Sequence, residues 1–289
     1  ASCGRASDDP GDGSADLLMR AEGAWVMAEA NSWQSWVCLE HHTHGTVSDD
    51  PHSWHTLLDT ALTQGRFRLF FQPVVSSTDT QQVLHYKVLS RLLDNQDQTI
   101  AAGQFLPWLE RFGWTARLDQ LMLDLVIKQL AQHNQSVAMN LSAATLNDPQ
   151  ALEHIFERLA QYPALGPRLI LEIGEEQVPE QSQLELMIRR MRNLGYSLGL
   201  QRFGGRFSMI GNLAHLGLAY LKIDGSYIRA IDQESHKRIF IEAIQRASHS
   251  IDLPLIAERV ETEGELRVIR EMGVEGVQGQ LVGEPASWQ

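Results

Sequence analysis

The stretch FRLFFQPVVSSTDTQQVLHYKVLSR (67–91) decides how the predicted sheet begins. It contains two short β-rich runs, 67–74 and 83–91, separated by a polar segment. That segment is too short to contain a crossover helix, which parallel strands require. We therefore expect the two strands to be antiparallel.

The second run raises a question about charge. Its residues alternate between two faces, so Lys87, Leu89 and Arg91 share one face of the strand. The two cations are then ~7 Å apart and repel each other unless an anion lies between them. This face therefore predicts a nearby anionic group.

Further β-rich runs alternate with helical segments along the rest of the chain. The predicted strands are 67–74, 83–91, 136–141, 168–175, 197–203, 218–224, 253–259 and 274–279. The predicted helices are 115–132, 148–160, 181–194, 235–250 and 263–272. This order is typical of an α/β fold, a modified TIM (β/α)8 barrel with an antiparallel first strand. A doubly wound open sheet is the alternative.

Polar residues occur where nearly every predicted strand ends, although residues facing only a core would be apolar. They are Lys87, Arg91, Asn140, Glu172, Glu175, Gln201, Arg202, Lys222, Asp224, Glu258 and Gln278. The carboxyl ends of barrel strands form the functional face of such folds. The pattern therefore predicts one site at that face.

Composition limits the partners. The chain has 289 residues and a net charge of −12, which argues against a general nucleic-acid or membrane-surface binder. We expect no DNA or RNA partner. The two cysteines, Cys3 and Cys38, indicate no disulfide framework. No apolar run reaches the ~18 residues of a membrane span, and we expect this part of the protein to be cytoplasmic.

Eight ordered segments are similar to the motifs of the EAL-domain family. They are QPVV (72–75), KVLSR (87–91), NLS (140–142), LEIGE (171–175), QRFGGRFS (201–208), LKIDGSYI (221–228), IAERVET (256–262) and VQGQLVGEP (277–285). Typical family forms are QPIV, EALLR, NLS, LEITE, DDFGTGYSS, LKIDRSFI, IAEGVET and VQGYLFSKP. The resemblance covers residues 56–289. It implies a modified TIM barrel whose active members linearise cyclic di-GMP with two divalent cations.

The departures from these motifs fall on metal-binding positions. Lys87 stands where the family has its naming glutamate, and Gln201 and Arg202 stand where it has two aspartates. Residues that would carry −3 carry +2 here, a change of +5. Two-metal hydrolysis needs several anionic oxygens around both ions. We therefore expect no catalytic residues, no requirement for Mg²⁺ or Mn²⁺, and no phosphodiesterase activity.

The resemblance also implies that the altered site binds cyclic di-GMP. The expected ligand-binding residues are Gln72, Lys87, Leu89, Arg91, Asn140, Glu172, Lys222, Glu258 and Gln278. Arg91 is the expected bidentate phosphate contact. Lys87 is expected either near a phosphate or paired with Glu172 or Glu258. The alternatives are a residual metal-dependent phosphodiesterase and a protein-interaction scaffold without ligand.

A loop after the fifth strand is a predicted switch. Glu175 matches the motif glutamate that steadies this loop, and Arg202, Phe203 and Phe207 lie in or beside it. We expect ligand binding to rearrange this loop and to promote a homodimer.

The N-terminal region gives two further expectations. Residues 15–33 are similar to the end of a GGDEF domain, so we expect a degenerate GGDEF fragment (1–42), a linker (43–55) and a degenerate EAL domain (56–289). The five histidines within 41–55 indicate either a metal site or, as we favour, a solvated linker. The resemblance implies a receptor that contacts its GGDEF domain and upstream helix in a bacterial inner-membrane protein controlling biofilm adhesion.

Overall fold

The structure is a computed structural model that describes residues 3–6, 36–39 and 50–288. It divides into two compact units. The smaller contains residues up to Arg68 and Ser90–Thr115, and the larger contains Leu69–Leu89 and Ala116–Gln289. Two of the divisions along the chain fall within strands, β3 (Phe67–Ser76) and β4 (Val83–Leu93).

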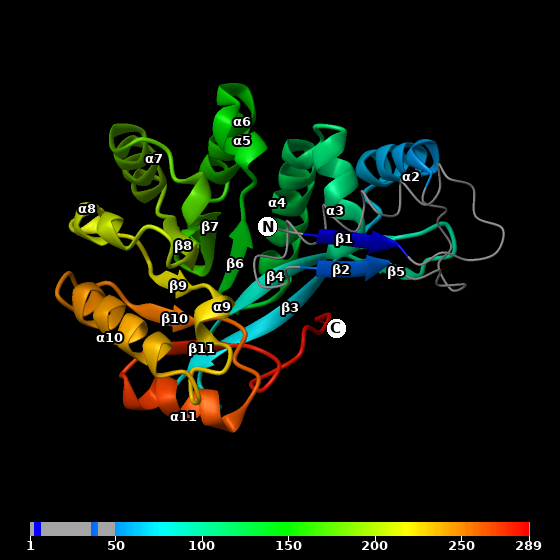
Figure 1. Ribbon diagram of the computed structural model, residues 1–289. Helices are drawn as coiled ribbons and strands as arrows, with labels where there is room; N and C mark the ends of the chain where they lie inside the picture. The colour runs from blue at the N-terminus through cyan, green and yellow to red at the C-terminus, as the bar shows by residue number, and fades with distance from the viewer. Residues whose placement is uncertain (1–2, 7–35, 40–49, 289) are drawn as a thin grey trace. The chain divides into compact units, whose positions relative to one another are not determined.

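The larger unit is built around a closed barrel of eight strands within the described part of the chain (Figure 1). The strands are β3 (Phe67–Ser76), β4 (Val83–Leu93), β6 (Val137–Asn140), β7 (Leu169–Gly174), β8 (Ser197–Phe203), β9 (Leu221–Ile223), β10 (Leu255–Ala257) and β11 (Gly276–Gln278). From β4 to β11, each strand is parallel to the next strand in the barrel. β3 is antiparallel to β11 and also pairs with β4, which closes the barrel. The predicted α/β barrel with an antiparallel first strand is confirmed.

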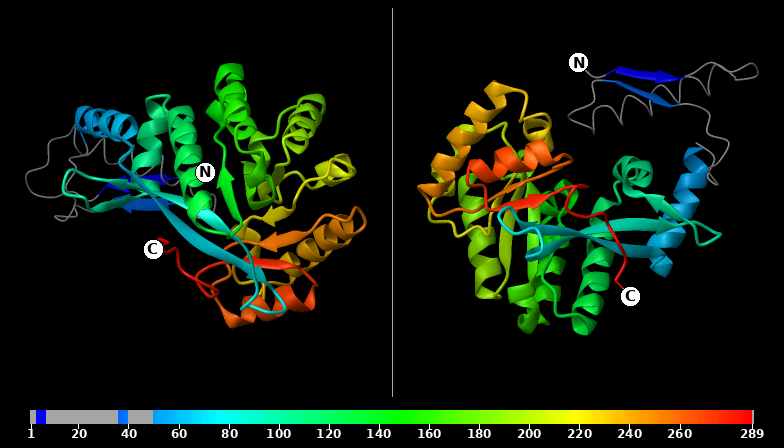
Figure 2. Two further views of the ribbon diagram at one scale, coloured as in Figure 1. Left: turned by 180° about the vertical axis from the view of Figure 1, so that it is seen from behind. Right: turned by 90° about the horizontal axis from the view of Figure 1, so that it is seen from below.

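Helices follow the parallel strands and lie outside the barrel (Figure 2). The longer ones are α4 (Thr115–Gln132), α6 (Pro149–Ala160), α7 (Gln181–Asn193), α10 (Ser235–His249) and α11 (Glu263–Glu271). The shorter ones are α5 (Ala143–Asn147), α8 (Ile210–Leu213) and α9 (Gly225–Ile228), with 3-10 segments η1 (Pro163–Arg168), η2 (Glu175–Gln177) and η3 (Phe207–Met209). Their starts follow local rules: a capping box joins Thr262 and Glu265 at α11.

The smaller unit contains α2 (Pro51–Gln64), β5 (Thr99–Ala101) and α3 (Ala102–Arg111). α2 begins after Asp50, whose side chain accepts a 2.9 Å hydrogen bond from the backbone N–H of Ser53. This helix includes 51–55, which the sequence assigned to the linker. Inside the unit, Trp54 stacks on Trp108 with ring centroids 5.9 Å apart.

Two short N-terminal strands, β1 (Cys3–Ala6) and β2 (Trp36–Leu39), pair in parallel. The GGDEF-like segment 15–33 and the histidines His41, His42 and His44 lie outside the described residues. His52 and His55 are exposed on α2. None of the helices that the structure describes has the length and apolar character needed to cross a bilayer.

The barrel interior carries the polar residues that the sequence placed on strands. On β4, His85 and Lys87 are buried, whereas Leu84 is exposed and Tyr86 is half-buried. Glu172 and Lys222, on other strands, are completely buried. A barrel interior is normally filled by branched apolar side chains, so this polar set marks the site.

Candidate functional site

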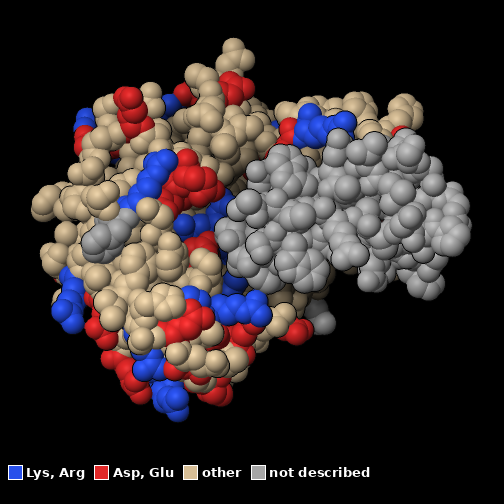
Figure 3. All heavy atoms as spheres, viewed as in Figure 1, with Lys and Arg blue, Asp and Glu red and all other residues tan. Residues whose placement is uncertain are grey.

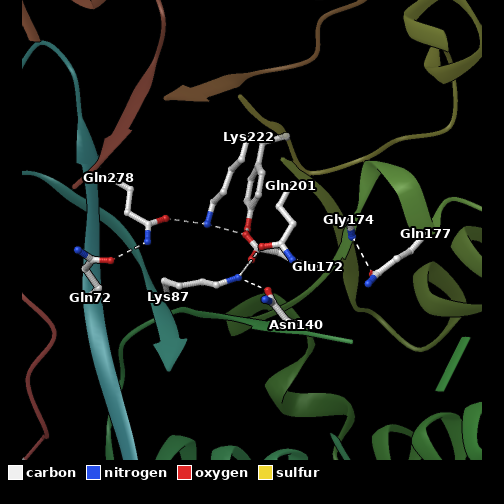
Figure 4. Close-up of polar contacts among 10 residues, drawn as sticks. Gln72, Lys87, Asn140, Glu172, Gly174, Gln177, Gln201, Lys222 and Gln278 are labelled. Carbon is white, nitrogen blue, oxygen red and sulfur yellow. Dashed lines mark hydrogen bonds and ion pairs between the residues drawn. The ribbon is translucent and has the colours of Figure 1, made fainter. Parts of the chain in front are cut away.

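Glu172 lies at the centre of the candidate site (Figure 4). Its Oε1 atom is 2.6 Å from Nζ of Lys222 and accepts a 2.6 Å hydrogen bond from the hydroxyl group of Tyr220. Its other oxygen, Oε2, accepts from the ammonium group of Lys87. Both carboxylate oxygens are therefore bound, and a buried anion is paired with two cations.

The ammonium group of Lys87 has three acceptors. It donates to Oδ1 of Asn140, to Oε2 of Glu172 and, at 3.1 Å, to Oε1 of Gln201. These acceptors come from β6, β7 and β8, and only 4% of Lys87 is exposed. An ammonium group has three N–H donors, so these acceptors use its full capacity.

The strand register explains why these side chains lie close together. Asn140 lies opposite Glu172 where β6 pairs with β7, and Lys87 lies one strand away, opposite Ala138. Gln201 of β8 pairs with Gly174 of β7, two residues after Glu172, so it lies near the same carboxyl end of the strands. Polar side chains from three neighbouring strands thus converge on the ammonium group that β4 supplies.

A second chain of hydrogen bonds runs to the antiparallel strand. Lys222 donates to Oε1 of Gln278 at 3.2 Å, and Gln278 donates to Oε1 of Gln72 at 2.9 Å. Gln72 in turn donates to the carbonyl oxygen of Gly283 at 3.1 Å. β3 therefore contributes to the site, although it runs against the other strands.

Electrostatics fix the protonation of the central carboxylate. Burial favours the neutral form of Glu172, but Lys222 and Lys87 outweigh it and lower the pKa of this carboxyl group below its usual range. Burial lowers the pKa of the Lys87 ammonium, and Glu172 opposes that change. Burial also raises the pKa of Glu258, which is partly exposed at the end of β10. The site therefore contains one firmly ionised carboxylate and one that is harder to ionise.

These residues do not fit a pair of divalent cations. A hard cation requires free carboxylate, carbonyl or amide oxygens around it. Here Lys87 occupies the oxygens of Asn140, Glu172 and Gln201 that would serve a metal. Among the described residues, no group of three or more His, Cys, Asp or Glu side chains is placed to hold an ion.

The loop after β8 is held by a buried glutamate. Glu175 accepts hydrogen bonds from the backbone N–H groups of Gly205 at 2.8 Å and Arg206 at 2.7 Å. Arg202 has a positive φ of 54° and pairs with Glu176, and Phe203 is fully buried. The backbone of Phe207 begins η3, but its side chain lies outside what the structure describes.

The structure brings together most of the residues predicted from the sequence. Hydrogen bonds connect Gln72, Lys87, Asn140, Glu172, Lys222 and Gln278. Leu89 is half-buried on β4. Arg91 belongs to the smaller unit, where it pairs with Ala101 and donates to the carbonyl oxygen of Ser90 at 3.0 Å.

Two buried residues were not predicted. Tyr220 binds Glu172, and His85 stacks on the Tyr220 ring with centroids 5.1 Å apart. Tyr220 and His85 each lie two residues before a predicted site lysine. Because side chains alternate along a strand, this spacing was the available signal.

Comparisons with known proteins agree with this geometry. Residues 56–285 match the EAL domain family. MucR of Pseudomonas aeruginosa, a bifunctional diguanylate cyclase/cyclic di-GMP phosphodiesterase, is 25% identical over 96% of this chain and 41% of its own length. PdeF of Escherichia coli, a cyclic di-GMP phosphodiesterase, is 25% identical over 79% of this chain and 31% of its own. This chain thus spans less than half the length of these two relatives.

Solved structures show the same fold. A GGDEF–EAL portion of Vibrio cholerae LapD bound to c-di-GMP matches with a TM-score of 0.84 and 24% identity, over 96% of this chain and 68% of that one. The c-di-GMP-bound EAL domain of Pseudomonas aeruginosa FimX matches with a TM-score of 0.71 and 26% identity, over 81% and 96%. With the family match and the barrel geometry, these findings establish that the chain belongs to the EAL-domain family.

Proposed function

We propose that this chain is a catalytically inactive EAL domain that binds cyclic di-GMP as a receptor and needs no Mg²⁺ or Mn²⁺ to do so. The observation that carries the proposal is the ammonium group of Lys87 bound to Asn140, Glu172 and Gln201. A cation attached to the chain takes the oxygens that a metal ion would need.

The same arrangement argues against hydrolysis. Two-metal catalysis generates hydroxide on one ion and stabilises the leaving oxygen with both. Lys87 has no vacant site for water, and no second carboxylate lies among its acceptors. Gln201 is neutral and Arg202 is a cation, so neither recruits a second ion.

The choice of ligand rests on the relatives. The FimX domain is 26% identical and the MucR phosphodiesterase domain 25% identical, and both were solved with c-di-GMP bound. This chain also keeps a connected polar network across the barrel, from Gln72 to Asn140.

The experiment is calorimetric titration with cyclic di-GMP in excess EDTA, with a parallel assay for linear pGpG. We expect binding in EDTA and no product with or without Mn²⁺. Arg91→Ala should abolish or strongly weaken binding, because it removes the expected bidentate phosphate contact. Arg189→Ala, at an exposed position on α7, is the matched control and should bind like the original chain.

Two results would replace the proposal. Binding and turnover that appear only with Mn²⁺ would show a residual phosphodiesterase, the activity named for MucR and PdeF. No binding under either condition would leave a scaffold for protein contacts.

The cellular context extends the proposal. KVLSR (87–91) resembles the corresponding LapD motif, and the fold match to LapD includes residues before the EAL domain. We propose that this chain is the cytoplasmic part of an inner-membrane receptor that controls biofilm adhesion. Ligand binding would act through the Glu175 loop, dimerisation and contact with the GGDEF domain. Light scattering with and without ligand tests the dimer: a mass that ligand leaves unchanged contradicts it.

A further inference from the structure

The two buried lysines of the larger unit are already bound to protein acceptors. Lys87 has its three acceptors, and Lys222 contacts Glu172 at 2.6 Å and Gln278 at 3.2 Å. On the face shown in Figure 3, many Lys and Arg side chains lie beside Asp and Glu side chains. A cation at the strand ends would add to the charge available to an anionic ligand there.

Arg259 is an exposed cation at such a position. It follows β10 by two residues, and the backbone N–H of Glu258 still donates to the carbonyl oxygen of Ile223 at 3.3 Å. Pairing between β9 and β10 thus continues to Glu258, the residue directly before Arg259. Its φ of 58° lies in the left-handed region, which is costly for an L side chain.

Gly225 provides the space for the Arg259 stem. A Cβ atom at Gly225 would lie 2.6 Å from Cδ of Arg259 and 2.8 Å from its Cβ and Cγ. Such distances are far below van der Waals contact, so a side chain at 225 would displace this arginine. The aliphatic stem of Arg259 therefore packs directly on the backbone at the start of α9, which limits the directions its guanidinium can take.

The residue types at these two positions are complementary. The typical motifs quoted above, LKIDRSFI and IAEGVET, have arginine at the first position and glycine at the second. This chain has LKIDGSYI and IAERVET, with glycine at 225 and arginine at 259. One guanidinium group is therefore present at the ends of β9 and β10 in both cases. In this chain the residue after β10 supplies it, and that arginine adopts a left-handed φ.

We propose that Arg259 binds a phosphate of the dinucleotide and that Gly225 is its positioning partner. The inference rests on the proposed function, because it concerns the same site. Guanidinium groups pair bidentately with phosphate oxygens, and a stem that is already ordered loses less entropy on binding. Arg259 then adds a guanidinium group at the strand ends, where the dinucleotide is proposed to bind.

Calorimetry with cyclic di-GMP in EDTA tests the role of Arg259. Arg259→Gly should weaken binding roughly 10- to 100-fold, the effect of losing a charge-assisted hydrogen bond. Its melting temperature should be unchanged or higher, because glycine tolerates the left-handed φ. Arg259→Lys keeps the positive charge but loses the planar guanidinium group. Its affinity should lie between those of the original chain and Arg259→Gly.

Two further variants test the pairing with Gly225. Gly225→Ala should weaken binding while Arg259 is still present, because the new Cβ displaces its stem. The double variant Gly225→Arg with Arg259→Gly should recover affinity relative to Arg259→Gly alone.

The possible failures are distinguishable. If the original chain binds and Arg259→Gly binds equally well, the role of Arg259 is overturned and the receptor proposal stands. Weakened binding in Arg259→Gly without recovery in the double variant would overturn the positional exchange. If the original chain does not bind at all, the receptor proposal fails and this inference fails with it.

Discussion

Lys222 Nζ lies 2.6 Å from Oε1 of Glu172, and neither side chain is exposed to solvent. A buried ion pair of this kind depends on both partners. Glu172 also neutralises Lys87, so one carboxylate serves two buried ammonium groups. This relationship makes Glu172 the residue whose loss should matter most.

Glu172→Gln should destabilise the protein strongly. Two buried cations would lose their counter-ion, and breaking a buried pair in this way typically costs about 3–5 kcal/mol. Urea unfolding measures the change in free energy. Lys87→Met is the comparison, because Glu172 then keeps Lys222 and the loss should be smaller. If Lys87→Met lost as much unfolding free energy as Glu172→Gln, or more, the result would contradict a carboxylate shared by two lysines.

Replacing Lys87 should open the site to metal. Lys87→Glu combined with Gln201→Asp removes the ammonium group and adds two carboxylates beside Glu172 and Asn140. We expect Mn²⁺ to raise the melting temperature of this double variant, because an ion that binds only the folded state stabilises it. Mn²⁺ should not change the melting temperature of the original chain or of Lys87→Met. Equal stabilisation of the original chain would show that Lys87 does not block the ion.

Acid should destabilise the protein partly through His85. Burial, followed by the charge of Lys222, lowers the pKa of this imidazole from 6.5 to about 3. Its Nε2 atom is buried without a hydrogen-bond partner in the described structure. The unfolded chain therefore binds a proton near pH 6.5, whereas the folded chain resists it until about pH 3. Stability due to neutral His85 is complete above pH 6.5 and falls as the pH drops.

His85→Phe isolates this contribution, since phenylalanine can still stack on Tyr220 and does not titrate. Between pH 6.5 and 4, the original chain should lose about 1.4 kcal/mol more per pH unit than the variant. Unfolding free energies measured across this range decide the matter. Parallel curves for the two proteins would be evidence against a buried neutral histidine.

Neighbouring glutamates should differ in their effect on the loop after β8. Glu175→Gln keeps the shape but loses one charged acceptor for the N–H groups of Gly205 and Arg206. Hydrogen bonds to charged groups contribute about 1.5–3 kcal/mol, so these amides should exchange hydrogen markedly faster. Glu176→Gln breaks only an exposed pair with Arg202, worth about 0–1 kcal/mol, and is the control. Similar exchange in both variants would mean that Glu175 does not anchor the loop.

Much of the barrel could be predicted because its strands and helices follow local rules. The run 197–203 is a strand and the run 115–132 a helix, as expected. The helix α2 was assigned partly to a linker, because its first turn contains Pro51, His52 and Ser53 rather than an apolar stripe. Its Asp50 cap was the signal for a start at Pro51.

The site was less predictable, because it depends on neighbours across strands. The sequence left Lys87 between a phosphate, Glu172 and Glu258. In the structure the ammonium group of Lys87 binds Glu172, and Asn140 lies directly opposite Glu172 on β6. The role of Arg91 stays a prediction, since this residue belongs to the smaller unit. A strand can be predicted from the local sequence pattern, whereas the partner of a buried charge depends on how all the strands pair in the sheet.

The attachment of the Lys87 cation to the backbone has a consequence for signalling. Occupancy of a metal centre rises and falls with the free concentration of its ion, which cells buffer and compete for. A tethered ammonium group is present in every copy of the folded protein at a fixed stoichiometry. Under the proposed function, a receptor built in this way would report the abundance of its dinucleotide without depending on the supply of divalent ions.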